Sequence, residues 1–323
     1  MTLQFHSALG PPASLIERVA ACNPDNPFCT PKYVTASESL GGQACFIGLC
    51  DGDEVVSGCI GLVSGTFLRR GLLIHSLPSL PSPEIFWDGL MELCGSLKVW
   101  RLQLDSFASP HAEIPKLPGE IARRERWEYL LDISNDSFLD GIKKQHRYNI
   151  SRAIKAGLSL RRTREASACA VHLELMTASM ERRADRGEDV ELHENGARPL
   201  ALLNSGLGEL FQAVEGDRVL SSLLILRSSR GAYGQSAGNS PEGMKVGASH
   251  FLWSSAAIAL QREGVQVFNL GGTDAENPGL QRFKKGFGAR EVALQAASFC
   301  PRSSVEREIH GALRSGWGWI KGQ

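Results

Sequence analysis

One hairpin pattern occurs in each half of the chain: an apolar segment, a short turn of acidic residues and glycine, and a second apolar segment. It covers residues 46–61 around Asp51-Gly52-Asp53, and residues 210–226 around Glu215-Gly216-Asp217. An acid–glycine turn between two apolar runs is typical of a β-hairpin. Because each hairpin lies among further strand-like and helix-like segments, we predict two related α/β domains, over residues 1–133 and 134–323. Each would have a mixed central sheet flanked by helices.

The hydrophobic pattern around the two hairpins supports this division. In the first half it predicts helices at 13–22 and 84–95, and strands at 43–50, 54–63, 72–77, 99–104 and 127–133. In the second half it predicts helices at 138–156, 169–186, 199–206 and 249–263. Strands are expected there at 158–161, 208–214, 218–226, 232–237 and 265–270.

Composition bounds the partners of the chain. Its 323 residues allow two domains with real cores, and 35 basic residues balance 35 acidic ones. Without a net charge, no overall field attracts nucleic acid or a membrane, so any polyanion would be met by a local patch. The N-terminus lacks the pattern of a secretory signal, and no apolar run is long enough to span a bilayer.

Cysteine and histidine spacing gives no sign of a metal site. The eight cysteines form no CxxC pair, several alternate with apolar residues in predicted strands, and the histidines are scattered. We therefore expect reduced core cysteines, no bound metal and a cytoplasmic protein.

A local basic excess lies between Asp140 and Glu165, where eight lysines and arginines occur without an acid. In a chain of zero net charge this segment is the best candidate for phosphate contact, whether in tRNA, a nucleotide-sugar or coenzyme A. Lys144, Arg147 and Arg152 are the predicted phosphate-binding residues. A solvated helix face is the alternative interpretation.

The C-terminal part contains an apolar strand at 265–270 that ends in Gly271-Gly272. Paired glycines let another molecule approach the backbone closely, because no Cβ is in the way. A short helix after Pro278 would bring Lys284 back toward this strand end. A lysine beside exposed backbone suits chemistry on a carbonyl, where negative charge develops on oxygen. A tight turn and a solvated lysine are the plain alternatives.

Six segments, in this order, resemble the FemAB-like branch of the GNAT-fold acyltransferases, which includes peptidoglycan aminoacyltransferases and the BioF2-like acetyltransferase domain. They are residues 147–157, the hairpin around 215–217, and residues 233–237, 247–263, 268–272 and 279–288. The last segment, Gly279-Leu280-Gln281-Arg282-Phe283-Lys284-Lys285-Gly286-Phe287-Gly288, is the most specific. The resemblance implies tandem GNAT domains and a transferase that moves an aminoacyl or acyl group onto an amine, among others that of a cell-wall precursor.

The resemblance also implies roles for particular residues. Phe283 and Lys284 match a pair at the reaction centre of the peptidoglycan enzymes, where the lysine stabilises an oxyanion or leaving hydroxyl. Asp274 is a further catalytic candidate, which would orient the substrate amine. Substrate binding is expected from Tyr233, Gln235, Ser236, Asn269, Gly271 and Gly272, and from an arginine among Arg182, Arg183 and Arg186.

Two departures from the family leave the donor open. Asn269 stands where many relatives have an acid, so we assign no general base there. The phosphate-cradling motif of ordinary GNAT enzymes is not reproduced, and residues 244–248 are its nearest equivalent. We expect no tightly bound cofactor; acyl-CoA or aminoacyl-tRNA would be the co-substrate, with tRNA bound at the basic segment. The alternatives are a CoA-dependent N-acetyltransferase of a small molecule and a non-catalytic GNAT-like binding module.

Overall fold

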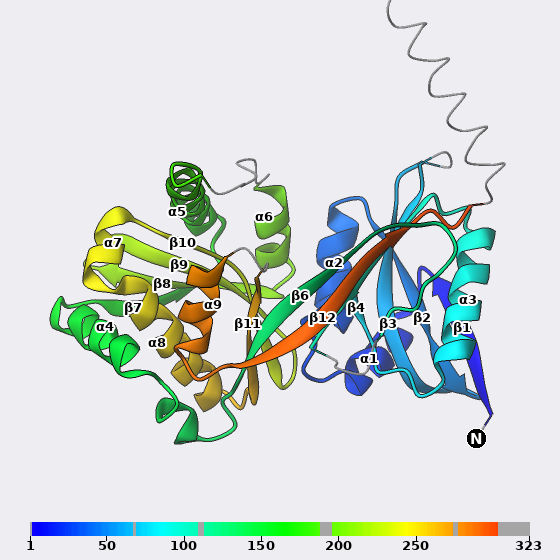
Figure 1. The fold of residues 1–323 in the computed structure, drawn as a ribbon, viewed down its shortest axis with the longest axis horizontal. Helices are drawn as coiled ribbons and strands as arrows, with labels where there is room; N and C mark the ends of the chain where they lie inside the picture. Colours follow the sequence, from blue (N-terminus) through cyan, green and yellow to red (C-terminus); the bar gives the residue numbers. More distant parts are fainter. Residues whose placement is uncertain (1, 67–68, 109–112, 188–195, 274–276, 303–323) are drawn as a thin grey trace, which may run out of the picture. The chain divides into compact units, whose positions relative to one another are not determined.

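The computed structural model describes residues 2–66, 69–108, 113–187, 196–273 and 277–302 (Figure 1). The chain forms two compact units, and neither is continuous in sequence. Unit 1 comprises Met1–Pro11, Gln43–Glu125 and Gln295–Gln323, whereas unit 2 comprises Pro12–Gly42 and Arg126–Leu294. This division differs from the predicted boundary at residue 133, because residues 12–42 and the strand beginning at Arg290 pair or pack far from their sequence neighbours.

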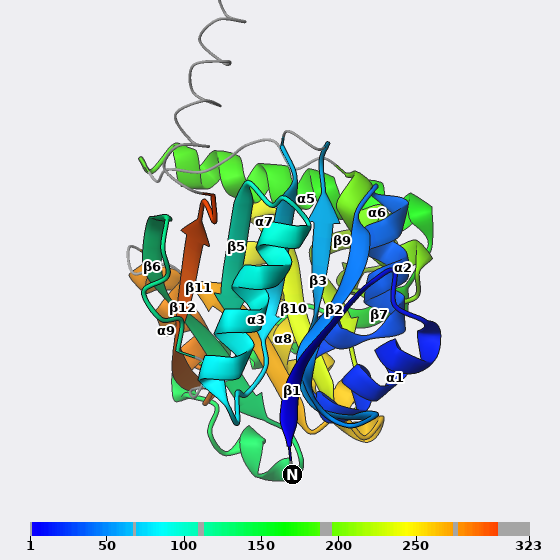
Figure 2. The same ribbon diagram turned by 90° about the vertical axis from the view of Figure 1, so that its right-hand side faces the viewer.

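The described part of unit 1 is a mixed sheet with one covering helix (Figure 2). Its strand order is β1 (Leu3–Leu9), β2 (Gln43–Asp51), β3 (Glu54–Ser64), β4 (Gly71–Leu77), β5 (Arg101–Ser106) and the end of β12 (Arg290–Phe299). Neighbouring strands are antiparallel except β4 and β5, which are parallel and joined by α3 (Pro83–Ser96). Phe5 packs against Gly89 of α3, where a Cβ would lie 2.1 Å from its ring.

Unit 2 is a second mixed sheet, and it carries every described helix except α3. Its sheet runs in the order β12, β6 (Glu120–Asp132), β11 (Val267–Thr273), β10 (Gly231–Asn239), β9 (Arg218–Arg227), β8 (Gly208–Glu215) and β7 (Ser159–Thr163). β10 and β11 are parallel. The pairs β6–β11, β9–β10, β8–β9 and β7–β8 are antiparallel.

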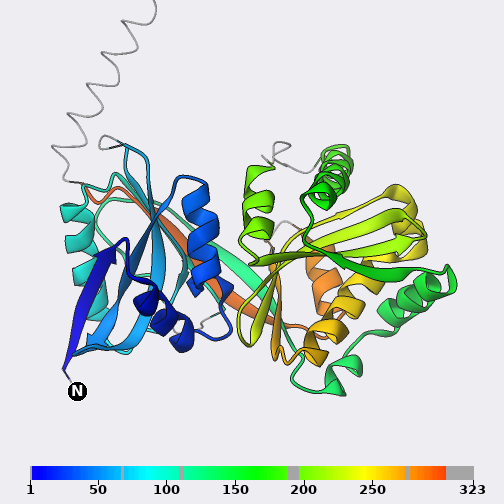
Figure 3. The same cartoon turned by 180° about the vertical axis from the view of Figure 1, so that it is seen from behind.

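Helices cover both faces of the unit 2 sheet (Figures 1 and 3). On one face, α5 (Ala166–Ala184) lies over β10, where a Cβ on Gly238 would meet the α5 backbone at 2.4 Å. On the other face, α8 (Ala248–Arg262) places Trp253 against Gly234 and stacks it on Phe268 at 5.5 Å. The remaining helices are α1 (Ala13–Cys22), η1 (Pro27–Cys29), α2 (Pro31–Ser39), η2 (Asp136–Leu139), α4 (Lys144–Lys155), α6 (Ala197–Asn204), α7 (Pro241–Val246) and α9 (Pro278–Lys285).

The two units repeat one strand pattern, which confirms the predicted fold class. In each, an antiparallel hairpin leads to a third strand and then through a helix to a parallel fourth strand: β2, β3, β4, α3, β5 and β8, β9, β10, α8, β11. Both predicted hairpins are present with their acid–glycine turns. The strand beside the fourth one comes from elsewhere in the chain, β12 in unit 1 and β6 in unit 2.

Several elements differ from the sequence-based prediction. The predicted helix at 138–156 is two helices, η2 and α4, separated at residues 140–143. The edge strand β1 was not predicted, because it is short and none of its residues is fully buried. β12 was also missed, since its register depends on the distant strand β5.

Candidate functional site

The candidate site lies where the parallel pairing of β10 and β11 ends. Three residue pairs form this ladder, and Tyr233 with Asn269 is the last. Both strands continue beyond it, β10 along β9 to Asn239 and β11 along β6 to Thr273. Each carries an irregularity there: Gln235 is an extra residue relative to β9, and the register of β11 shifts between Asn269 and Gly272. Such bulges occur often next to active sites, because they redirect side chains and end strand pairing.

Gly271 is required by this geometry. Its φ of +79° lies in the left-handed region, and a Cβ there would sit 2.8 Å from the carbonyl oxygen of Gly234. Its backbone N–H donates to Oδ1 of Asn269 at 2.8 Å. The first glycine of the pair therefore holds the two strands close, and its amide is already engaged by a side chain of the same strand.

Lys284 is buried beside the second glycine of the pair. Asn277 caps α9 by accepting the N–H of Leu280 at 3.0 Å, and Pro278 is the first residue of the helix. Nζ of Lys284 donates to the carbonyl oxygen of Gly272 at 2.8 Å, and the residue is 5 % exposed. It forms no ion pair with a carboxylate among the residues that the structure describes.

The pKa of Lys284 lies close to neutral pH. Burial lowers the pKa of its ammonium to about 7, with a smaller contribution from Arg126, while the negative charge of Glu128 opposes the shift. The ring of Tyr129 lies 5.6 Å from Nζ and provides a weak cation–π contact. Protonated and neutral Lys284 are therefore both populated near pH 7.

Glu128 is a site residue that the sequence-based prediction missed. It is fully buried on β6 and accepts hydrogen bonds from Nδ2 of Asn269 at 2.8 Å and from Arg126. Asn269, which replaces the acid of many relatives, thus lies against a carboxylate from a neighbouring strand. The available sequence signal was an acid in the apolar segment at 127–133.

Phe283 packs into an aromatic cluster behind Lys284. Its ring centroid lies 5.1 Å from those of His250 and Phe287, 5.6 Å from that of His146 and 6.3 Å from that of Trp253. Phe283 and Phe287, four residues apart, thus pack against each other. This cluster fixes α9, and with it Lys284, against α4 and α8.

His146 joins the basic helix α4 to α9. Its Nε2–H donates to the carbonyl oxygen of Phe283 at 2.8 Å, and the N–H of Lys143 donates to the carbonyl oxygen of Gly286 at 2.9 Å. A Cβ on Gly286 would lie 2.1 Å from the His146 ring. Since that ring is enclosed by aromatic neighbours, it has little room to move away.

We predict that Gly286→Ala destabilises the fold by roughly 1–3 kcal/mol, the usual cost of forcing an extra carbon into a packed site. His146→Ala should relieve the clash, so the double variant should lose less stability than the sum of the two single variants. Urea unfolding of the three variants measures this coupling. Additive losses would show that the imidazole and the added methyl group do not collide.

The three predicted binding residues of β10 have different surroundings. The ring of Tyr233 packs edge-on against that of Phe28 at 5.2 Å. Oε1 of Gln235 is buried without a hydrogen-bond partner in the described structure. The Ser236 hydroxyl bonds Nε2 of His172 at 2.9 Å, and Nδ1 of that imidazole bonds the hydroxyl of Ser222 at 2.9 Å.

The comparisons with known proteins agree with this geometry. Residues 143–285 match the family model of the acetyltransferase (GNAT) domain. This part of the chain is a GNAT domain. No protein with a curated description matches the chain significantly. The match to a family of acetyltransferases makes the protein an enzyme of the acyltransferase class.

Solved structures share the fold over most of the chain. A crystal structure of FemX is 13 % identical, with a TM-score of 0.67 over 87 % of this chain and 95 % of that one. The C-terminal domain of a putative lysylphosphatidylglycerol synthetase from Agrobacterium fabrum is 14 % identical, with a TM-score of 0.54 over 94 % and 95 % of the two chains. A tandem GNAT protein from the clavulanic acid biosynthesis pathway is 11 % identical, with a TM-score of 0.54 over 94 % and 100 %. The tandem protein and FemX agree with the predicted FemAB-like architecture.

The three arginines that were candidates for substrate binding lie at different positions along and beyond α5. Arg182 donates to the carbonyl oxygen of Asn239 at the end of β10 and to the hydroxyl of Ser179. Arg183 is in the last turn of α5, whereas Arg186 lies beyond the helix, which ends at Ala184. Arg182 thus attaches α5 to a site strand. Asp274 lies outside the described residues.

The basic segment of the GNAT domain divides into two parts. Lys144 and Arg147 are exposed on α4, whereas Arg152 is partly buried with an Nε that has no hydrogen-bond partner among the described residues. The pKa of His250, the third residue of α8, is lowered to about 4. Burial is the largest cause, followed by the charges of His146 and Arg152. Arg152 is therefore close to the start of that helix.

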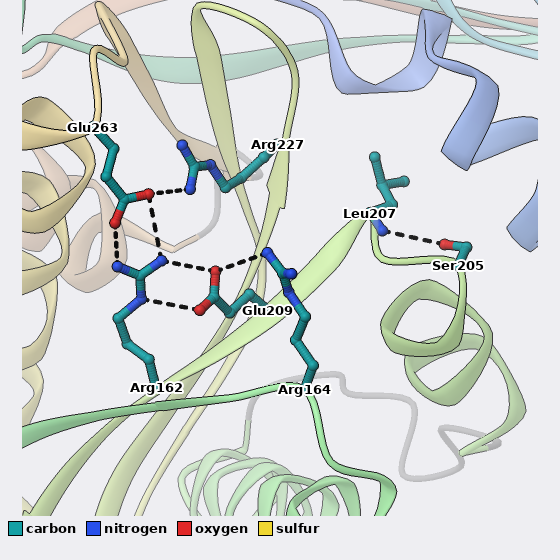
Figure 4. Close-up of polar contacts among 7 residues, drawn as sticks. All are labelled: Arg162, Arg164, Ser205, Leu207, Glu209, Arg227 and Glu263. Atoms are coloured by element: carbon teal, nitrogen blue, oxygen red, sulfur yellow. Dashed lines mark hydrogen bonds and ion pairs between the residues drawn. The ribbon is translucent and has the colours of Figure 1, made fainter.

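In the second part of the segment, two arginines form ion pairs with acids (Figure 4). Arg162 pairs with Glu209 at 2.9 Å and also with Glu263, and Arg164 pairs with Glu209 at 3.3 Å. Arg227 pairs with Glu263 as well. These ion pairs connect β7, β8, β9 and the end of α8, so Arg162 and Arg164 have a structural role.

No helix in the described ranges is long and apolar enough to cross a membrane.

Proposed function

We propose that this protein is an N-acyltransferase that moves an acyl group from acyl-CoA to an amine, with the reaction where the parallel pairing of β10 and β11 ends. This proposal rests on one observation: the amine of Lys284 is buried beside Gly271-Gly272 within a GNAT domain. Position, burial and near-neutral pKa together distinguish it from a solvated helix lysine.

The proposed reaction requires little from the protein beyond orientation and charge stabilisation. The acceptor nitrogen attacks the thioester carbonyl, a C–N bond forms, and the C–S bond breaks as the thiol leaves. The ammonium of Lys284 has two N–H groups beyond the one bound to Gly272, and either can donate to the carbonyl oxygen as it becomes negative. We assign the proton of the acceptor amine to solvent, since Glu128 is fully buried and held by Asn269.

Acyl-CoA is the proposed donor because GNAT domains use it and because a phosphate-binding group is available. Arg152 lies near the start of α8, and the N-terminus of a helix favours bound phosphate. Arg152 is only partly buried, so its guanidinium can donate to a phosphate oxygen. Lys144 and Arg147, exposed on the same helix, add positive charge.

Aminoacyl-tRNA is the second candidate donor, with a cell-wall precursor as acceptor. The fold similarity to FemX and the exposed cations of α4 favour it. A tRNA donor would make activity sensitive to ribonuclease and strongly dependent on salt, because phosphate contacts release bound counterions.

We predict that acetyl-CoA supports transfer to an amine from a panel of amino sugars, amino acids and polyamines, with release of one thiol for each amide formed. Arg152→Gln should raise the KM for acetyl-CoA at least about tenfold with little change in kcat, because it removes binding common to ground and transition states. Lys155→Gln, on the same helix, is the matched control. Mass spectrometry of products and a thiol assay measure both.

Two results would redirect this assignment. Transfer from charged tRNA alone, abolished by ribonuclease, would identify the second donor. Ligand binding without transfer from any donor would instead support a binding module.

A further inference from the structure

We propose that Lys284 is also an acylation site of the protein itself: without an acceptor amine, its Nζ takes the acyl group of a bound thioester donor. This inference rests on the proposed function, because it needs a donor carbonyl where the parallel pairing of β10 and β11 ends. It adds a covalent modification with a regulatory consequence.

The contacts of Lys284 leave its amine able to act as a nucleophile. The bond to Gly272 uses an N–H, so a neutral amine keeps its lone pair. No carboxylate of the described residues forms an ion pair with Nζ. A Cβ built on Gly271 would lie 3.6 Å from Nζ, so the amine faces the glycine pair itself.

Burial supplies the reactive form of the amine. A lysine reacts with a carbonyl only when neutral, and desolvation is a recognised way to populate that form. A pKa lowered to about 7 gives Lys284 a far larger neutral fraction at neutral pH than an ordinary exposed lysine has. The group that stabilises the oxyanion when protonated is therefore a competing nucleophile when neutral.

The modification balances without a further reactant. Nζ attacks the thioester carbonyl carbon, the new C–N bond forms, and the C–S bond breaks. The sulfur leaves as a thiolate and takes up the proton that the amine loses, so the products are an Nε-acyl-lysine and a free thiol. The acylated side chain has no positive charge, so it cannot donate as an ammonium. Self-acylation would thus inactivate the enzyme when acceptor is absent.

Lys285 provides a matched comparison in the next position. Its side chain is 41 % exposed, and its Nζ pairs with Glu291 at 2.8 Å. General chemical acylation would favour this accessible lysine over its buried neighbour. Selective reaction of Lys284 would therefore reflect its position and not its accessibility.

The experiment uses the full-length chain with acetyl-CoA and, separately, with p-nitrophenyl acetate, a small ester that requires no coenzyme binding. Peptide mass spectrometry would follow acetylation of Lys284 and Lys285 over time at pH 6 and pH 8. We expect Lys284 to be modified at least about tenfold faster than Lys285 with acetyl-CoA. Its acetylation should remove activity in proportion. Lys284→Arg, which keeps a charge without a nucleophilic amine, should remain unmodified in that peptide.

The outcomes separate this inference from the proposed function. Acetyl transfer to an external amine with Lys284 unmodified by both reagents would overturn the self-acylation and leave the function intact. Modification by p-nitrophenyl acetate alone would retain the nucleophilic lysine but remove acyl-CoA as donor. Modification of Lys285 at an equal or higher rate would overturn the inference.

Discussion

Lys284→Met is expected to lower kcat by about 100-fold or more while changing the KM for the acyl donor by less than about threefold. Removing one preorganised donor to a developing oxyanion typically costs two to three orders of magnitude in kcat. Methionine keeps the length and apolar stem of the side chain, so the packing of α9 should persist. Steady-state kinetics with the best donor and acceptor pair would measure both constants.

Lys285→Met is the control for that experiment, because it removes a neighbouring charge without reaching the glycine pair. It should retain most of the kcat. An equal loss of donor binding and turnover in Lys284→Met would remove this lysine from the chemistry and assign it to binding alone. Of the variants proposed, Lys284→Met tests the proposed function most directly.

Local sequence signals predicted the parts of the site that one segment supplies. Gly271-Gly272 and Lys284 were identified because a strand end and a helix start lie within a few residues of each other, and both hairpins follow from their turns. Nζ of Lys284 donates to the carbonyl oxygen of Gly272 at 2.8 Å, at the strand end toward which the sequence places it. Short-range patterns were sufficient here because the chain between these residues is short.

The parts that distant segments supply could not be predicted. Glu128 reaches Asn269 only because β6 pairs with β11, and neither segment carries a signal for the other. The same holds for His172 of α5, which meets hydroxyls from β9 and β10. A buried polar residue in an apolar segment indicates that a partner exists, whereas the identity of the partner depends on strand register.

His172 illustrates how burial decides chemistry that residue type alone leaves open. A histidine between two serines suggests a proton-transfer chain, but desolvation lowers the pKa of His172 to about 4. The imidazole is therefore neutral at physiological pH and a weak base. Its two hydrogen bonds satisfy a buried polar group and fix Ser236, so we give it no part in the proposed reaction.

Lys284→Met should also increase stability, and by most at pH 7 and below. The pKa of an unfolded lysine is about 10.4, and in the folded protein burial lowers that of Lys284 to about 7. Between these values the unfolded state binds more protons, so this residue makes the fold more stable as the pH rises from about 7 to about 10. Below pH 7 the folded protein carries the full cost of a buried ammonium.

Methionine removes that cost, which is on the order of 5 kcal/mol at about 1.4 kcal/mol for each tenfold change in protonation. The gain from Lys284→Met should therefore be largest at pH 6, smaller at pH 8 and close to zero at pH 10. Urea unfolding at these three values measures it, with Lys285→Met as the reference for a pH-independent change. A loss of stability at pH 6 would show that the ammonium is well solvated, and the proposed catalytic and self-acylation roles would then lack their physical basis.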